Sequence, residues 1–299
     1  MCKSFYNKNK LFEKAMTKRA LSLRIILGIP FFIIIVLAFI YNINYKMKKI
    51  KGVTSTRYPI VFVPGLWSID KVLIEDFKIY DYFDGVEEYL IEKGYRVYTS
   101  KTIGADSIEN RALVLKKIIE KDVGSKVNII AHSMGGLDAR YMVSQLGMAP
   151  MVASISTIST PHRGSSFADW GLEHIGEKLK GLEILEAIGF KTIGYKELTT
   201  KYMNEIFNPL TPDSPKVKYF SYAGSQETRK IFPPLLIPHK IIMDREGEND
   251  GLVSVRSAKW GTFMGIIDAD HLDQRGWLTT FNAKKFYENI VLDLKKQGF

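Results

Sequence analysis

The chain has 299 residues, 46% of them hydrophobic and 25% charged, which excludes an intrinsically disordered protein. Its single cysteine, Cys2, excludes an intrachain disulfide and a cysteine-based zinc site. The formal charge of +10 would suit a nucleic-acid-binding protein, but its location argues against one. Eleven of the 42 basic residues and one of the 32 acidic residues lie in residues 1–51, so the rest of the chain is electrically neutral.

Residues 25–45 carry no charge and are flanked by basic residues on both sides. A helix of this length covers about 32 Å, close to the ~30 Å hydrocarbon core of a bilayer. No small-x-small cleavage site follows the apolar run. We therefore expect a basic segment at 1–24, an uncleaved transmembrane signal anchor at 25–45 and a linker at 46–57. A cleaved signal peptide and a buried core helix are the alternatives. The positive-inside rule favours a cytoplasmic N-terminus and leaves the compartment open.

Strands and helices alternate through residues 58–299, the predicted catalytic domain. The hydrophobic pattern predicts strands at 58–63, 95–99, 126–131, 152–158 and 217–222, and helices at 85–93, 107–122, 137–146 and 280–296. Such alternation indicates an α/β fold with a mostly parallel, doubly wound sheet. A Gly- and Pro-rich insertion at about 165–215 interrupts the pattern, and an insertion of this size is more often functional than connective.

The segment from Ala131 to Gly136 lies where an apolar strand meets a helix. A serine flanked at two positions on either side by small residues is the pattern of a nucleophile elbow. Ala131 and Gly135 are the small residues that a strained turn at Ser133 requires. The next backbone N–H, that of Met134, would then face a developing oxyanion at the start of the helix.

A serine hydroxyl needs a positioned base, and with this elbow the acid and then the histidine follow the serine along the chain. Of the five histidines, His271 follows the last predicted strand and precedes the C-terminal helix. Asp250 stands in an Asp-Gly turn after the apolar pair 241–242, which we interpret as a strand end. Asp244, Asp268 and Asp270 are the alternative acids, Asp244 first among them. The loop after the first strand should supply a second oxyanion donor, and Leu66 N–H beside Gly65 is the candidate.

These motifs resemble those of α/β-hydrolase lipases, both the Pseudomonas-type bacterial triacylglycerol lipases and the related fungal mitochondrial-type lipases. The resemblance covers about residues 58–290 and rests on blocks at 59–65, 131–141, 159–165 and 249–254, the last followed by 271–273. It implies an α/β-hydrolase fold and a Ser133, Asp250, His271 triad. It also implies an oxyanion hole at Leu66 and Met134 and a helical lid after residue 165.

Two positions depart from the family pattern. The first loop reads Pro64-Gly65 where the family usually has His-Gly, which leaves a backbone oxyanion hole intact but alters the acyl pocket. Bacterial relatives carry a structural calcium near the histidine. Asp273 matches one ligand position, but Trp277 replaces the expected glutamine. We therefore expect no metal and no cofactor, and a solvated Asp273.

The sequence thus predicts a membrane-anchored serine lipase or esterase whose substrates are lipid esters, cleaved through an acyl-enzyme. An acyltransferase that uses the same triad to pass an acyl group from a phospholipid to an alcohol is the alternative. A non-catalytic binding module on the hydrolase fold is a third hypothesis, which an intact triad disfavours.

Overall fold

The computed structural model describes residues 56–66, 73–74, 77–78, 82–100, 104–176, 192–277 and 281–299. The predicted anchor at 25–45 and the linker up to residue 55 lie outside these residues. Within the described ranges, no helix combines the length and apolar character needed to cross a bilayer.

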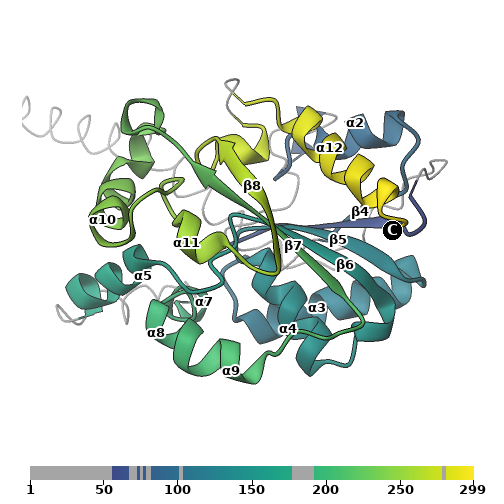
Figure 1. The fold of residues 1–299 in the computed structure, drawn as a ribbon, viewed down its shortest axis with the longest axis horizontal. Helices are drawn as coiled ribbons and strands as arrows, with labels where there is room; N and C mark the ends of the chain where they lie inside the picture. Colours follow the sequence, from purple (N-terminus) through teal and green to yellow (C-terminus); the bar gives the residue numbers. More distant parts are fainter. Residues whose placement is uncertain are drawn as a thin grey trace, which may run out of the picture. The chain divides into compact units, whose positions relative to one another are not determined.

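A six-stranded sheet forms the centre of the catalytic domain (Figure 1). Its strand order is β4-β1-β5-β6-β7-β8, and every neighbouring pair is parallel. The strands are β1 (Ile60–Val63), β4 (Val97–Thr99), β5 (Val127–His132), β6 (Val152–Ile158), β7 (Lys218–Ser225) and β8 (Thr262–Asp268). A separate antiparallel pair joins β2 (Leu73–Ile74) and β3 (Phe77–Lys78). The mostly parallel sheet expected from the sequence is therefore confirmed.

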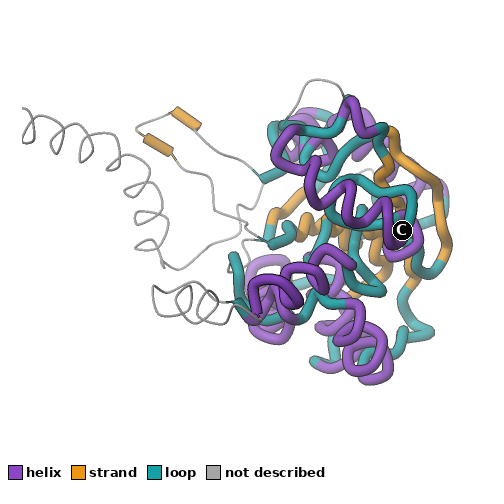
Figure 2. Tube along the Cα trace, turned by 90° about the vertical axis from the view of Figure 1, so that its left-hand side faces the viewer, coloured by secondary structure: helices purple, strands orange, loops and turns teal. Residues whose placement is uncertain are grey.

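Helices cover both faces of the sheet (Figures 1 and 2). One face carries α3 (Ile108–Ile118) and α4 (Gly135–Gln145), and the other carries α2 (Val86–Glu92) and α12 (Ala283–Lys296). Successive side chains of a strand point to opposite faces, so Val61 and Val63 pack with α3 and α4. Ile60 and Phe62 pack with α2 and α12. The result is a core on each side of the sheet.

The insertion after β6 is helical where it is described, as expected. It contains α5 (Ser166–Gly171), α7 (Ile193–Lys196), α8 (Thr200–Tyr202) and α9 (Asn208–Leu210), with π-helical turns at Leu172–Gly176 and Met203–Phe207. Residues 177–191 of the predicted lid lie outside the described residues. Together with α10 (Leu236–Glu246) and α11 (Val255–Ala258), these helices gather at one end of the sheet (Figure 1).

Two elements differ from the expectation. The apolar pair 241–242 lies inside α10, so Asp250 follows a helix and not a strand. A sixth strand, β8, was not predicted. It is the outer strand of the sheet, and Phe263, Met264 and Ile266 are exposed along it, which removes the alternation that identifies a half-buried strand.

Candidate active site

Ser133 occupies a sharp turn between β5 and α4. Its φ of 55° lies in the left-handed region, which a non-glycine residue adopts at a cost of about 1–2 kcal/mol. Hydrogen bonds hold the turn, because Ser133 N donates to Ile158 O at 2.9 Å and Thr160 Oγ1 donates to Ser133 O at 2.7 Å. A Cβ at Gly135 would lie 2.5 Å from Val63 O, so the small residue that the elbow pattern predicts is sterically required.

The loop after β1 lies directly against the elbow. A Cβ at Gly65 would come within 2.6 Å of Ser133 Cβ, so a glycine is needed for this approach. The next residue, Leu66, packs in the same apolar cluster as Met134. The two predicted oxyanion donors thus belong to the two segments that adjoin Ser133.

His271 and Asp250 form a buried pair. His271 Nδ1 lies 2.7 Å from Asp250 Oδ2, and His271 N donates to Asp250 O at 2.8 Å. Asp250 Oδ1 accepts from the backbone N–H groups of Leu252 and Val253 at 3.0 and 2.8 Å. Burial acts to raise the pKa of Asp250, but the interaction with His271 and these hydrogen bonds outweigh it and leave that pKa below its usual range. The carboxylate therefore stays ionised and orients the imidazole.

The acid–base pair lies beside the elbow. The ring centroids of His132 and His271 are 4.6 Å apart, and His132 immediately precedes Ser133. Ser133 directly follows β5, and His271 lies in the segment that follows β8. The carboxyl ends of parallel strands lie at the same edge of the sheet. The structure therefore places Asp250 and His271 in one hydrogen-bonded pair, with the His271 ring beside the residue that precedes Ser133.

The alternative acids lie elsewhere. Asp244 is exposed on α10, and Asp268 is exposed and paired with Lys230. Asp270 is buried, but its carboxylate accepts from the backbone N–H groups of Phe232, Leu272 and Asp273 and so organises the loop. Within the described parts of the chain, Asp250 is the acid bonded to the His271 imidazole.

Three polar residues around the pair were not predicted from the sequence, namely Tyr82, Ser159 and Gln274. Gln274 Nε2 donates to Asp250 Oδ2 at 3.0 Å, and Tyr82 Oη lies 2.8 Å from His132 Nδ1. Ser159, with φ 46°, accepts from Gly224 N and lowers the pKa of Asp250 by hydrogen bonding. Of these, Gln274 had a signal in the sequence, since it follows His271 by three residues.

Comparison with known proteins shows the family to which the chain belongs. A model of the PGAP1-like alpha/beta domain matches residues 105–184. Triacylglycerol lipase 2 of Saccharomyces cerevisiae is 40% identical over 248 residues, which cover 73% of this chain and 74% of the yeast protein. The chain belongs to the triacylglycerol lipase family. It is an ester hydrolase, and the predicted family resemblance is confirmed.

Other relatives agree with this assignment. Triacylglycerol lipase of Burkholderia plantarii is 38% identical over 124 residues, 39% of this lipase and 33% of the bacterial protein. The mature lipase BlEst2 of Bacillus licheniformis superposes with a TM-score of 0.64 at 21% identity, covering 83% of this chain and 96% of that one. The lipase of Staphylococcus hyicus superposes with a TM-score of 0.60 at 18% identity, covering 82% of this chain and 97% of that one. These structures show that the lipase has the α/β-hydrolase fold.

The expectation for Asp273 was wrong. Asp273 is 2% exposed in a 3₁₀ turn at Asp273–Arg275, although the sequence suggested a solvated loop residue. Two hydrogen bonds join the turn to residues 82–84. Arg275 Nε donates to Tyr82 O at 3.3 Å, and the backbone N–H of Asp84 donates to Arg275 O at 2.9 Å. In the described residues, no three His, Cys, Asp or Glu side chains gather as metal ligands would.

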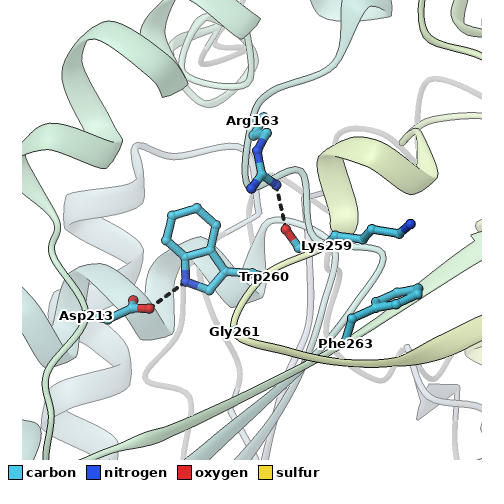
Figure 3. A pocket seen from close by; sticks show the side chains of 6 residues that line it. All are labelled: Arg163, Asp213, Lys259, Trp260, Gly261 and Phe263. Atoms are coloured by element: carbon cyan, nitrogen blue, oxygen red, sulfur yellow. Dashed lines mark hydrogen bonds between the residues drawn. The ribbon is translucent and has the colours of Figure 1, made fainter.

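A surface pocket of about 390 Å³ surrounds Trp260 of this lipase (Figure 3). Its lining residues are Arg163, Asp213, Lys259, Trp260, Gly261 and Phe263. Trp260 Nε1 donates to Asp213 Oδ2 at 2.8 Å, and an Arg163 amino group donates to Lys259 O. None of Ser133, Asp250 and His271 lines it.

Proposed function

We propose that the chain is a membrane-tethered serine lipase that cleaves lipid esters, triacylglycerols among them, through an acyl-enzyme on Ser133. The observation that carries this proposal is the strained Ser133 turn beside the buried Asp250–His271 pair. A serine held in this way, an imidazole and an ionised carboxylate hydrogen-bonded to it are the components of nucleophilic acyl transfer.

The mechanism follows from the positions of these groups. His271 takes the proton of Ser133 as Oγ attacks the ester carbonyl, and Asp250 holds the imidazole with Nδ1–H toward the carboxylate. The backbone N–H groups of Leu66 and Met134 stabilise the tetrahedral oxyanion. His271 then protonates the leaving alcohol and activates the water that releases the acyl group.

The substrate class is supported by two observations. The yeast and bacterial relatives bear the name triacylglycerol lipase. The helices at the site end of the sheet also expose apolar side chains that a lipid surface would cover, namely Ile193, Ile206, Leu210, Leu236 and Ile237. A lid role for residues 165–215 is part of the same proposal.

The experiment is labelling with a fluorophosphonate, which reacts with activated serines. We expect labelling of the wild type and none of Ser133→Ala. Hydrolysis of triacylglycerol, phospholipid and short-chain esters should be lost in the same variant. Absence of labelling, or equal labelling of both proteins, contradicts the serine mechanism. A new ester in place of free fatty acid as the dominant product would favour the acyltransferase.

The tether is proposed from the uncharged residues 25–45 and their basic flanks, with the N-terminus in the cytoplasm. The full chain should remain in the membrane fraction after alkaline carbonate extraction. Replacing Ile34 and Leu37 together by Lys should release it, because each buried charge costs about 2.5–3.5 kcal/mol. Release of the unaltered chain by carbonate contradicts the tether, and Leu113→Lys, at an exposed position of α3, is the control that should stay bound.

A further inference from the structure

The amide of Gln274 is built into the wall of the site. Gln274 is 0% exposed and donates from Nε2 to Asp250 Oδ2 at 3.0 Å. The same oxygen lies 2.7 Å from His271 Nδ1, so the amide and the imidazole share one carboxylate oxygen. A Cβ at Gly224 of β7 would lie 2.0 Å from Gln274 Nε2 and 2.8 Å from Asp250 Cβ. The sheet therefore leaves no room for the amide to move away from the carboxylate on that side.

The ring of His132 lies on the other side of this arrangement. His132 is fully buried, and its Nδ1 lies 2.8 Å from Tyr82 Oη. A tyrosine hydroxyl that donates to Nδ1 leaves the imidazole proton on Nε2. Burial lowers the pKa of His132 well below its usual value, with smaller contributions from His271 and Arg275, so the ring is neutral beside His271.

Two buried polar atoms remain without a hydrogen-bond partner here. In the described part of the chain, they are His132 Nε2 and Gln274 Oε1. With the imidazole proton on Nε2, the first atom is a donor and the second is an acceptor. A hydrogen bond between these side chains acts to raise the pKa of His132. An unsatisfied buried group costs about 1–3 kcal/mol, and a hydrogen bond between these two atoms would remove that cost for both.

We propose that Gln274 is a positioning residue that links His132 to Asp250. His132 Nε2–H donates to Gln274 Oε1, which fixes the amide with Nε2 toward Asp250 Oδ2. Tyr82 sets the direction of this chain through its hydrogen bond to His132 Nδ1. The chain holds the Asp250 carboxylate where His271 needs it. This inference rests on the proposed serine mechanism and deepens it.

The test uses Gln274→Leu, which keeps the volume but removes both the donor and the acceptor. We expect kcat and the rate of fluorophosphonate labelling to fall by about 10- to 100-fold, as for a lost hydrogen bond to a charged group. KM should stay within about twofold, because Gln274 does not touch substrate. In the Asp250→Asn background the same substitution should change kcat by less than about threefold, because Gln274 acts through Asp250.

Gln226→Leu is the matched control. Gln226 is also a buried glutamine, but its Oε1 accepts from the backbone N–H of Glu227 and serves no catalytic group. Gln226→Leu should be labelled as fast as the wild type at a temperature below the unfolding midpoints of both proteins.

His132→Phe should lower the labelling rate. Adding Gln274→Leu to His132→Phe should lower the rate by less than the product of the two separate effects.

The outcomes separate this inference from the function beneath it. A wild type that shows no Ser133-dependent labelling overturns the serine mechanism and the inference together. A wild type that labels normally, with Gln274→Leu equally fast, overturns the inference alone. An undiminished effect of Gln274→Leu in the Asp250→Asn background, or an equal loss in folded Gln226→Leu, also overturns it, since the residue would then act through general packing.

Discussion

Backbone strain in the described residues is concentrated at the site. The non-glycine residues with positive φ there are Ser133 at 55° and Ser159 at 46°. They follow β5 and β6, which are neighbours in the sheet. Strain of this kind persists where surrounding contacts fix the backbone, and it clusters at functional sites. At Ser133 it directs the side chain away from the sheet, and at Ser159 it brings a hydroxyl to the acid.

The strain at Ser133 predicts an unusual stability order. Ser133→Gly and Ser133→Ala should both abolish labelling. Ser133→Gly should be more stable than Ser133→Ala by about 1 kcal/mol, because glycine adopts a positive φ without the steric cost of a Cβ. Denaturant unfolding measures the difference. An alanine variant as stable as the glycine variant would show that the turn is unstrained.

The hydrogen bond between His271 and Asp250 predicts the effect of removing one charge. Asp250→Asn should lower kcat by about 10³- to 10⁴-fold, because an amide can favour the wrong imidazole tautomer. Asp268→Asn, an exposed residue that pairs with Lys230, should retain wild-type kcat and serves as the control. Equal activity of Asp250→Asn and the wild type would point to another acid, with Asp270 the next to test.

At the scale of elements, Arg111 of α3 ties together three segments around the site. Its Nε donates to both Asp138 oxygens at 3.1 and 2.9 Å, and its Nη2 lies 2.8 Å from Oδ2. Its amino groups also donate to Gly104 O and to Pro64 O, at 2.6 and 2.9 Å. Arg111 thus fixes α4, which begins at the elbow, and the loop that bears Gly65. Burial raises the pKa of Asp138 to about 6, and Arg111 opposes that rise.

Arg111→Met should therefore destabilise the fold by about 3–5 kcal/mol near pH 8, where it leaves a buried carboxylate without its partner. The cost should shrink near pH 5. A carboxyl whose pKa is raised in the folded state stabilises the fold at low pH, and this stabilisation is lost as the pH rises through the folded pKa. For Asp138 that pKa is about 6, and it should be higher still without Arg111. Urea unfolding at both pH values tests this. Lys116→Met, at a partly exposed position of α3, should cost under about 1 kcal/mol at either pH.

For the molecule as a whole, charge and burial are separated along the chain. The net +10 belongs to residues 1–51, whereas residues 52–299 carry no net charge. Within the catalytic domain His132 and His162 are fully buried, and burial lowers the pKa of each well below 6.5. Both therefore stay neutral in the folded protein at a pH where the unfolded chain takes up protons.

This difference predicts a loss of stability in mild acid. Below pH 6.5 the unfolded state binds more protons, so the free energy of unfolding should fall as the pH drops, by about 1.4 kcal/mol per pH unit for each such histidine. His162→Gln should reduce this slope between pH 6.5 and 5. His174→Gln, at an exposed position, is the control for the removal of a histidine that is not buried. Equal slopes in all three proteins would show that the buried imidazole takes up a proton on acidification.

The sequence by itself determined the alternation of strands and helices along the chain and the elbow pattern around Ser133. Fully apolar strands such as 152–158 and the steric pattern around Ser133 are local signals, and both appear in the structure. Elements without a local signal were missed. The edge strand β8 exposes most of its residues, so its sequence lacks the alternation of apolar and polar residues that identifies a strand. The apolar pair 241–242 in α10 fits a strand pattern as well as a helix pattern.

Only the tertiary structure decided which polar residues surround the triad. Asp273 and Gln274 follow His271 in what the sequence presents as a loop, yet both are buried beneath the sheet edge. Gln274 meets Asp250 across 24 positions of sequence, and Tyr82 meets His132 across 50. A motif records spacing along the chain, whereas hydrogen bonds form between segments that the parallel sheet brings to one edge. For this reason Ser133, Asp250 and His271 could be predicted as site residues from the sequence, whereas the side chains that contact them could be found only in the fold.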